Sequence, residues 1–331
     1  MRALLLDRPG PPESLRVGHA PDPAPGPGQV RVRVEACGLN PVDHQVAAAG
    51  NPAWSWPHVP GLDVVGSIDA LGDGVEHLHL GQRVAYHGDL RRAGGLAELA
   101  LASATTVAVV PRGVAPAAAA ALPCAGMTAY QSVRRRLHVA AGDTLLVTGG
   151  AGGVGGFAVQ LGALAGATVI ATAARADAAH VRALGATHVV DHHTEDVPAR
   201  VQELTAGRGV DAVVDTVGTE SAERHLRLLV HGGGLAAVAG RPELTAVPPF
   251  TTAPSVHEIA LGAAHSHGDL RARADLAAML SELLALTASG ELDPMVSRTV
   301  ALADVPDALS AIKQGRGRGK VVYLAEGPAA P

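Results

Sequence analysis

The chain has 331 residues, of which 47% are hydrophobic, 17% charged and only 2% aromatic. The length is enough for about two domains, and the composition is typical of a globular chain rather than a disordered one. A formal net charge of -5 provides no positive surface for nucleic acid or an anionic membrane, so neither is expected as the primary partner.

The N-terminus has four consecutive apolar residues before Asp7, which is too short for the core of a signal peptide. No stretch approaches the ~18 uninterrupted apolar residues of a membrane span. The two cysteines, Cys37 and Cys124, cannot form a disulfide framework. We therefore expect a cytoplasmic protein.

Short strand-like runs separated by turns fill the first 120 residues. In "VRVRVEACGL", Val30, Val32 and Val34 alternate with charged residues, which is the pattern of a half-buried strand. Two further runs are "LDVVGSIDAL" and "QRVAYH". This part of the chain predicts a small, mainly antiparallel β domain.

After the helical segment "APAAAAALPCAGMTAYQSV", apolar runs alternate with helical stretches: "TLLVTG", "TVIATA", "THVVD", "VDAVVDTVG", "LAAVAG" and "EIALGAA". This alternation predicts βαβ units and a parallel sheet.

The C-terminal part begins with leucines at helical spacing between Leu270 and Gly290. The strand, helix and strand patterns "VSRTVAL", "VPDALSAIK" and "GKVVYL" follow it. We expect this tail to rejoin the first domain. The expected division is 1–122 for the first part of the β domain, 123–264 for the parallel-sheet domain and 265–331 for the return.

A glycine-rich motif stands between two of the predicted strands. Gly150, Gly152 and Gly155 have the spacing G-x-G-x-x-G, behind the strand-like "DTLLV" and ahead of the helical "GGFAVQLGALAG". Such glycines permit a tight turn and a close backbone approach, and the helix start binds a pyrophosphate. The strand–turn–helix context predicts a dinucleotide site rather than a glycine-rich turn without a ligand.

The choice of dinucleotide depends on the end of the next strand, where NAD-binding proteins carry a carboxylate about 20 residues beyond the motif. Counting 19 and 20 residues from Gly155 leads to Ala174 and Arg175. An arginine there can pair with a 2′-phosphate, which favours NADPH. Asp177 would repel that phosphate if it pointed inward, and a solvent-facing Arg175 is the alternative.

Several motifs together resemble one family. "CGLNPVD", "PGLDVVG", "GQRVAY", "LPCAGMTAYQSV", "GGAGGVGGFAVQLGALAGA", "VDAVVDTVG" and "GRGKVV" stand in the order typical of medium-chain dehydrogenases/reductases, and the chain is most similar to the quinone oxidoreductase branch. The resemblance covers almost the whole chain. It implies an α/β protein in which a GroES-like, mainly β catalytic domain is split around a Rossmann domain with a doubly wound parallel sheet. It also implies a homodimer formed by edge pairing of the Rossmann sheets.

Zinc enzymes of this superfamily hold their metal with a Cys in "GxC", a His in "GHE" and a later Cys. At these places the chain has Asn40, Leu62 and Cys124, and leucine supplies no metal ligand. An improvised site from His58, Asp63 and Cys124 is the alternative. We expect no metal, and we expect Cys124 to be a small buried residue.

The resemblance also implies the residues that contact the cofactor. Gly152, Gly153 and Val154 would meet the pyrophosphate, and Val217 and Val238 would lie on the adenosine and nicotinamide sides. His192 stands where relatives often have a tyrosine that contacts the nucleotide. Lys320 matches a lysine that often reaches the cofactor cleft. The full expected set is Gly150, Gly152, Gly153, Val154, Gly155, Arg175, His192, Val217, Val238 and Lys320.

The catalytic residues are also expected from position. Asn40 would donate to a substrate oxygen, Thr128 would abut the nicotinamide, and Asp43 would support the site, with a turn cap as the alternative for Asp43. Relatives often carry a tyrosine just after this Asp, but His44 and Gln45 stand here. The proton donor therefore stays open between His44, Tyr86, His87 and solvent.

Two tryptophans, Trp54 and Trp56, stand in the proline-rich run "NPAWSWPHVPG". They predict an apolar lid over a flat substrate, and a loop anchored on its own domain is the alternative. His87 and His265 are further candidates for the substrate wall, although a surface position is the favoured interpretation for His265.

Without a metal, the acceptor carbon must already be electrophilic, as it is in quinones and α,β-unsaturated carbonyls. Held by a hydrogen-bond donor, such a substrate can accept a hydride. We therefore expect a zinc-independent, NADPH-dependent reductase of a quinone or an enone. The alternatives are a nucleotide-binding sensor or structural protein with little catalysis, and an alcohol dehydrogenase-like enzyme acting on another carbonyl/alcohol pair.

Overall fold

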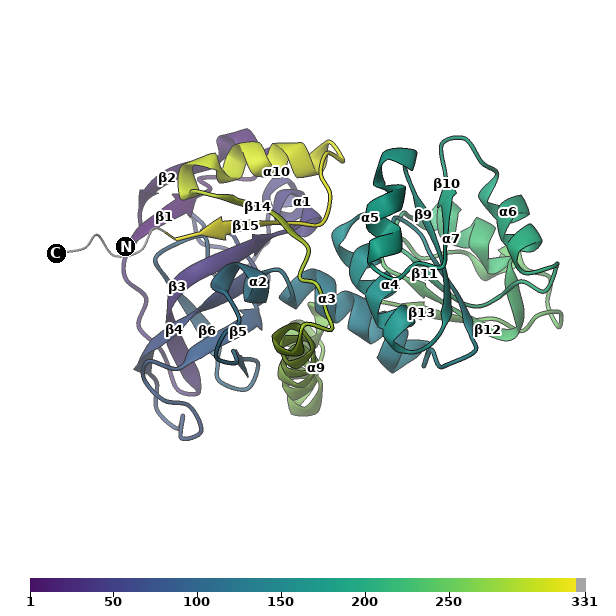
Figure 1. The fold of residues 1–331 in the computed structure, drawn as a ribbon. Coiled ribbons are helices and arrows are strands. Elements are labelled where there is room, and N and C mark those ends of the chain that lie inside the picture. Colours follow the sequence, from purple (N-terminus) through teal and green to yellow (C-terminus); the bar gives the residue numbers. More distant parts are fainter. Residues whose placement is uncertain (326–331) are drawn as a thin grey trace. The chain divides into compact units, whose positions relative to one another are not determined.

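The computed structural model describes residues 1–325, which form two units (Figure 1). One unit comprises Met1–Met127 and the chain from Gly262 onward, and the other comprises Thr128–Leu261. Boundaries were expected after residues 122 and 264. The two units divide after Met127, inside helix α3 (Pro123–Tyr130), and after Leu261.

The first unit contains a seven-stranded sheet in the order β14-β15-β3-β4-β5-β7, with β6 also paired to β3. Its core includes Val30, Val32 and Val34, all buried on one face of β3, so the alternation in the sequence is confirmed. The strands of this unit are β1 (Arg2–Leu5), β2 (Arg16–His19), β3 (Gln29–Leu39), β4 (Asp63–Leu71), β5 (Arg83–His87), β6 (Leu99–Ser103), β7 (Ala108–Val109), β14 (Val296–Val300) and β15 (Lys320–Leu324). Strands β1 and β2 form a separate antiparallel pair.

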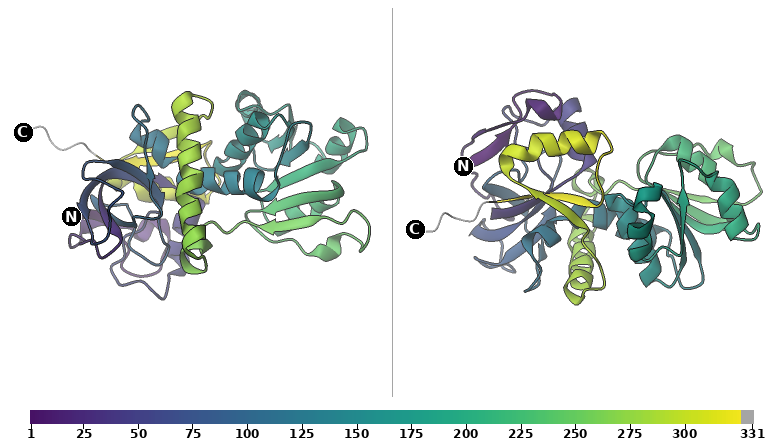
Figure 2. Two further views of the ribbon diagram at one scale, coloured as in Figure 1. Left: turned by 90° about the horizontal axis from the view of Figure 1, so that it is seen from below. Right: turned by 45° about the horizontal axis from the view of Figure 1, so that its top comes forward.

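The C-terminal segment completes this sheet, as expected. Strand β15 pairs antiparallel with β3, from Val321 opposite Leu39 to Leu324 opposite Ala36. Helix α10 (Val305–Lys313) packs against α1 (Pro41–Ala49). Figure 2 shows these late elements in yellow beside the early ones in purple. Residues from the two ends of the sequence are therefore neighbours in one sheet.

The remaining helical segments of the first unit lie around the sheet. They are η1 (Pro12–Ser14), α2 (Pro116–Ala120), the first part of α3, α8 (Ala263–Ser266), α9 (Leu270–Ser289) and η5 (Leu302–Asp304). The predicted long helix is α9, and it packs against β5 and β7. Asp269 caps its start, where its carboxylate accepts a hydrogen bond from Ala272 N at 2.8 Å, and Gly290 caps its end in the left-handed conformation, φ 80°. These two ends satisfy the usual capping preferences.

The second unit contains a six-stranded parallel sheet in the order β10-β9-β8-β11-β12-β13. The order reverses between β8 and β11, which is the switch point of a doubly wound Rossmann fold. The predicted fold class is therefore confirmed. Its elements are η2 (Gln131–Arg136), β8 (Thr144–Val147), α4 (Gly153–Leu164), β9 (Thr168–Ala173), η3 (Arg175–Asp177), α5 (Ala178–Ala183), β10 (His188–Asp191), α6 (Val197–Leu204), β11 (Val210–Asp215), α7 (Thr219–Leu226), β12 (Leu229–Ala237), η4 (Leu244–Ala246) and β13 (Ser255–Glu258).

The last strand of this sheet differs from the prediction. The strand was expected at "EIALGAA", but β13 is Ser255–Glu258, which pairs with Gly234–Ala237 of β12. The apolar residues Ile259 and Leu261 follow the strand and are buried. Apolarity marked the buried residues, whereas the hydrogen bonds of β12 determined which residues form the strand.

Within the described residues, 1–325, no helix combines the length and apolarity needed to cross a membrane.

The two phenylalanines of the chain provide a test of the second unit's core. Phe157 of α4 is fully buried, whereas Phe250 is fully exposed. We expect Phe157→Ala to cost about 3–5 kcal/mol of unfolding free energy, because the lost ring leaves a cavity in the core. Phe250→Ala should change it by less than about 0.5 kcal/mol. Urea unfolding of the full chain measures both, and equal losses would contradict this core assignment.

Candidate functional site

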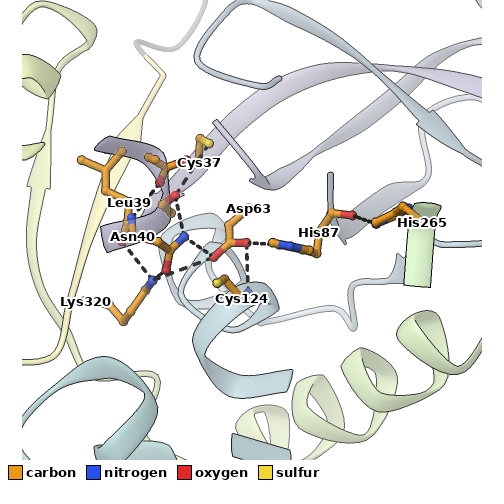
Figure 3. A network of polar contacts seen from close by, with 10 residues as sticks. Cys37, Leu39, Asn40, Asp63, His87, Cys124, His265 and Lys320 are labelled. Carbon is orange, nitrogen blue, oxygen red and sulfur yellow. Dashed lines mark hydrogen bonds and ion pairs between the residues drawn. The ribbon is translucent and has the colours of Figure 1, made fainter. Parts of the chain in front are cut away.

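The carboxylate of Asp63 lies at the centre of a buried polar network in the first unit (Figure 3). Its Oδ1 accepts hydrogen bonds from His87 Nδ1 at 3.0 Å and from Cys124 N at 2.9 Å. Its Oδ2 accepts one from Asn40 Nδ2 at 2.8 Å. Because the side chain has no exposed surface, these donors replace the water that a carboxylate needs.

The sheet register brings these residues together. Asp63, the first residue of β4, lies opposite Gly38 of β3 on one side and opposite His87, the last residue of β5, on the other. Helix α2 approaches the sheet closely here, since a Cβ on Gly38 would lie 2.1 Å from Ala120 O. The network therefore requires glycine at position 38, where the motif "CGLN" supplies it.

Lys320 contributes a buried positive charge to the network. As the first residue of β15, it donates from Nζ to Leu39 O at 3.0 Å and to Asn40 Oδ1. Its Nζ lies 3.8 Å from Asp63 Oδ2. The resemblance implied that this lysine reaches the cofactor cleft. Within the first unit its ammonium group balances the buried carboxylate.

Both polar atoms of the Asn40 side chain hydrogen-bond to other protein groups. Its Oδ1 accepts from Lys320, and its Nδ2 donates to Asp63 and, at 3.4 Å, to Gly38 O. Donation from this amide to a substrate oxygen would have to displace one of these contacts. Asn40 therefore positions Asp63 and Lys320 in this structure.

Asp43 caps helix α1 rather than joining the network directly. Its Oδ2 accepts from Asn40 N at 2.8 Å, which satisfies an amide at the start of the helix. Its Oδ1 is buried and has no hydrogen-bond partner within the described chain. Burial and the nearby charge of Asp63 raise the pKa of Asp43 to about 7.

His87 is held at its backbone as well as at its ring. Because His87 O can only accept, His265 Nε2 on α8 donates to it, at 3.0 Å. Arg91 in turn donates to His265 O at 2.9 Å. Burial and the neighbouring His87 lower the pKa of His265. The two histidines expected at a substrate wall thus lie together in the first unit.

The structure does not bring two other expected proton donors to this network. Tyr86 precedes His87 on β5, and successive strand residues point to opposite faces. Its hydroxyl is accordingly buried in the core without a hydrogen-bond partner in the described chain, and burial raises its pKa. His44 lies on α1, where burial and the charge of Lys313 lower its pKa.

The tryptophan pair divides into one structural residue and one exposed residue. Trp54 is buried, donates from Nε1 to Leu90 O at 2.7 Å, and stacks on His58 with ring centroids 3.8 Å apart. Burial lowers the pKa of His58 to about 4. Trp56 is 42% exposed and meets Trp54 edge-on. Trp54 therefore anchors the loop, and only Trp56 is free to contact a ligand.

Three side chains of the network have the spacing of a metal site. Ligand atoms of Asp63, His87 and Cys124 lie within 4.8 Å of one another, the only such group among the described residues. The improvised site considered from the sequence contained His58, but the register of β4 and β5 places His87 there instead. Burial and the charge of Asp63 raise the pKa of the Cys124 thiol, which disfavours the thiolate form that binds metals.

The glycine-rich turn of the second unit fits a dinucleotide. A Cβ on Gly155 would lie 2.1 Å from Gly149 O, and one on Gly150 would lie 3.0 Å from Ala171 Cβ. Gly149 itself has φ 65°, and α4 begins directly after the turn, at Gly153. Glycines at the start of a helix leave its backbone N–H groups accessible, and these groups bind a pyrophosphate.

A pocket of about 910 Å³ lies at the carboxyl ends of strands β8 to β11 in the second unit. Ligands of doubly wound sheets bind at this edge. Two of the expected residues, His192 and Val217, line the pocket, while Arg175 is exposed at the start of η3 and Val238 is half-buried beyond β12. The other lining residues are Thr148, Gly149, Thr172, Glu195, Asp196, Val197, Pro198, Gly218, Thr219, Glu220, Ser221, Arg224 and His225.

A carboxylate that hydrogen-bonds to residues of the pocket lining was not predicted from the sequence. Asp215, the last residue of β11, accepts from Ser221 Oγ at 2.6 Å and His225 Nδ1 at 3.1 Å, and from Val217 N at 3.0 Å. Burial opposes its ionisation, but the hydrogen bonds from His225 and Ser221 outweigh burial and lower its pKa. The carboxylate thus shapes the turn that lines the pocket. Its place at the end of an apolar strand was the available signal.

Thr128 lies on α3, four residues after Cys124 and so on the same face of that helix. It is buried, and its carbonyl accepts from Ser132 Oγ at 2.8 Å. It is the first residue of the second unit.

Comparison with known proteins gives consistent matches over the chain. Residues 26–112 match the alcohol dehydrogenase GroES-like domain family, and residues 184–322 match the zinc-binding dehydrogenase family. The quinone oxidoreductase of Pongo abelii is 29% identical over 98% of this chain and 98% of its own. A solved NAD-dependent alcohol dehydrogenase is 30% identical, with a TM-score of 0.86 over 98% of this chain and 100% of its own. The solved quinone oxidoreductase of Pseudomonas syringae pv. Tomato DC3000 is 29% identical, with a TM-score of 0.87 over 98% of this chain and 99% of its own.

The raised pKa of Asp43 predicts a pH-dependent stability difference. Between the ordinary value of 3.8 and about 7, the unfolded chain releases a proton that the folded chain keeps, so the stability contributed by Asp43 falls as pH rises. The amide introduced by Asp43→Asn does not titrate. The Tm of Asp43→Asn minus that of the unsubstituted protein should therefore increase from about pH 4 to about pH 7. A difference that decreases over this range would show that Asp43 is ionised when folded.

Proposed function

The chain belongs to the medium-chain dehydrogenase/reductase superfamily, in its quinone oxidoreductase-like branch, and on this premise we propose that it is an NADPH-dependent, metal-independent reductase of quinones or α,β-unsaturated carbonyls. It is an oxidoreductase with small-molecule substrates, and members of the superfamily bind nicotinamide cofactors. The choice of NADPH, the absence of a metal and the class of acceptor are the proposed parts.

The buried Lys320 ammonium group is the observation that carries the metal-independent mechanism. It lies 3.8 Å from Asp63 Oδ2 and bonds to Asn40 Oδ1, so a positive charge already occupies the carboxylate's surroundings. A divalent cation on Asp63 would meet this ammonium group at short range, which costs electrostatic energy in a buried site. Leu62, at the position of the expected histidine ligand, offers no donor atom.

The second unit would hold the cofactor. The turn at Gly149–Gly155 and the start of α4 fit the pyrophosphate, and the 910 Å³ pocket offers space for the adenosine part. We assign the 2′-phosphate to Arg175, because no carboxylate stands at that strand end. When bound, the reduced nicotinamide supplies a hydride.

The first unit would bind and orient the acceptor. Asp63, Asn40 and Lys320 form a rigid group whose polar atoms bond to one another, so the charges around a substrate are fixed in advance. Trp56 offers an exposed aromatic face to a flat substrate. An acceptor with an electrophilic carbon needs positioning and charge stabilisation rather than a Lewis acid.

A metal-dependent alcohol dehydrogenase is the second candidate, favoured by one observation. Asp63, His87 and Cys124 have ligand atoms within 4.8 Å of one another, and a solved relative is a NAD-dependent alcohol dehydrogenase. This alternative requires the thiol of Cys124 to release its proton to solvent and a ring nitrogen of His87 to be unprotonated, because metals bind the thiolate and the neutral imidazole.

We also propose a homodimer. Strand β13 is the last strand of its sheet and, within the described residues, pairs only with β12. An open edge of this kind can pair with the same strand of a second copy.

NADPH oxidation in the presence of quinones and enones tests the proposed activity and cofactor. We expect turnover with NADPH, and Arg175→Ala should weaken NADPH binding about 10- to 100-fold, the effect of losing one charged hydrogen-bond partner. NADH affinity should stay unchanged. Arg182→Ala is the matched control, because Arg182 is another exposed arginine nearby. Tight NADPH binding without turnover on any acceptor would favour a sensor, and equal losses for both cofactors would refute the phosphate assignment.

Metal analysis and chelation test the metal-independent mechanism. We expect substoichiometric zinc in the purified protein and full reductase activity after dialysis against a chelator, because Lys320 already supplies the positive charge beside Asp63. Activity that is lost on chelation and restored by zinc would establish the alcohol dehydrogenase alternative.

A further inference from the structure

We propose that His87, oriented by Asp63, is the general acid that delivers a proton to the α-carbon of an enone substrate. This inference rests on the proposed reductase function and adds the proton donor that the sequence left open. It follows from the contacts of His87 within the first unit, where both its ring and its backbone are held (Figure 3).

The Asp63 carboxylate determines which ring nitrogen of His87 is available. Its Oδ1 already accepts from Cys124 N, and its Oδ2 from Asn40 Nδ2, with Lys320 beside it. A carboxylate surrounded by donors acts only as an acceptor, so His87 Nδ1 carries a hydrogen and donates it to Oδ1 at 3.0 Å. Nε2 is then the nitrogen that can release and regain a proton, as in other carboxylate–histidine pairs.

The His87 side chain is buried, 4% exposed, and its Nε2 lies beside Gly262, which has no side chain to cover it. A Cβ on Gly262 would lie 3.8 Å from His87 Nε2 and 3.6 Å from Leu90 Cδ1. Any larger residue at position 262 would therefore extend its side chain beside Nε2, whereas glycine leaves that side uncovered. The bond from His265 Nε2 to His87 O fixes the end of β5 that carries the ring.

Other titratable groups of the first unit are less suited to this step. The hydroxyl of Tyr86 is enclosed in the core, and Asp43 is turned toward Asn40 N. Lys320 gives hydrogens to Leu39 O and Asn40 Oδ1. Among these groups only His87 combines an orienting carboxylate with a free ring nitrogen.

The proton and electron balance of the step is complete. Hydride addition forms a C–H bond at the β-carbon, and the electron pair of the C=C bond moves toward the carbonyl to give an enolate. The Nε2–H bond of protonated His87 then breaks, and the proton forms the C–H bond at the α-carbon. The neutral ring regains a proton from water after product release. With a quinone the protons go to oxygen atoms, which water can supply.

Deuterium labelling distinguishes this role from protonation by solvent. An enone with a substituted α-carbon is reduced with NADPH in D₂O, and the product is analysed by NMR for the face that received deuterium. We expect one face in the unsubstituted protein, and mixed faces with a roughly 10²–10⁴-fold lower kcat in His87→Gln, because a general acid contributes about that much. His19→Gln is the control, since His19 is an exposed histidine of the same unit.

A measurement without turnover tests the orientation of the ring. ¹⁵N NMR of the neutral His87 side chain should show hydrogen on Nδ1 and a lone pair on Nε2, and in Asp63→Asn this preference should weaken. The opposite tautomer in the unsubstituted protein would overturn the proposal, and an unchanged preference in Asp63→Asn would remove the orienting role of Asp63.

The outcomes separate the two proposals. If the unsubstituted protein reduces neither quinones nor enones with NADPH, the proposed function fails and the assignment of His87 fails with it. If it reduces enones but deuterium enters from both faces, His87 is not the donor even though the reductase function stands. The same holds if His87→Gln keeps the rate and the face. Deuterium on both faces in the unsubstituted protein excludes His87 as the donor even if the variant does not fold.

Discussion

The buried charge of Asp63 is the constraint on which the first unit depends. A carboxylate without exposed surface is stable only if protein donors replace its water, and here they come from three directions. His87 donates from the neighbouring strand, Cys124 N from helix α3, and Asn40 from the end of β3. Lys320, from the far end of the chain, adds the opposite charge.

The need to stabilise the buried Asp63 carboxylate connects the N-terminal and C-terminal segments. Strand β15 pairs with β3 along its length, and its first residue, Lys320, contacts Leu39 and Asn40 at the end of β3. The return of the tail to the first domain is therefore part of the site as well as of the fold. The same contacts engage Asn40, whereas His87 keeps one ring nitrogen that does not contact Asp63.

The second unit depends on a steric constraint instead. Its turn brings backbone so close to backbone that a Cβ on Gly155 would lie 2.1 Å from Gly149 O. Glycine is required there whichever dinucleotide binds, which is why the motif predicts the fold and the cofactor class but does not distinguish NADPH from NADH. The pocket next to it is shaped by Asp215, whose hydrogen bonds fix the turn that contains Val217.

The sequence by itself determined the two architectures, because periodicity reports burial directly. Alternating valines of β3, the βαβ rhythm and the leucine spacing of α9 all lie where the patterns placed them. Only the tertiary structure decided which polar residues meet. His87 rather than His58 reaches Asp63 because β4 and β5 pair in that register, and Tyr86 turns into the core because it is one residue away on the same strand. Register, edge pairing and the burial of a charge arise between segments distant in the sequence, so local patterns do not contain them.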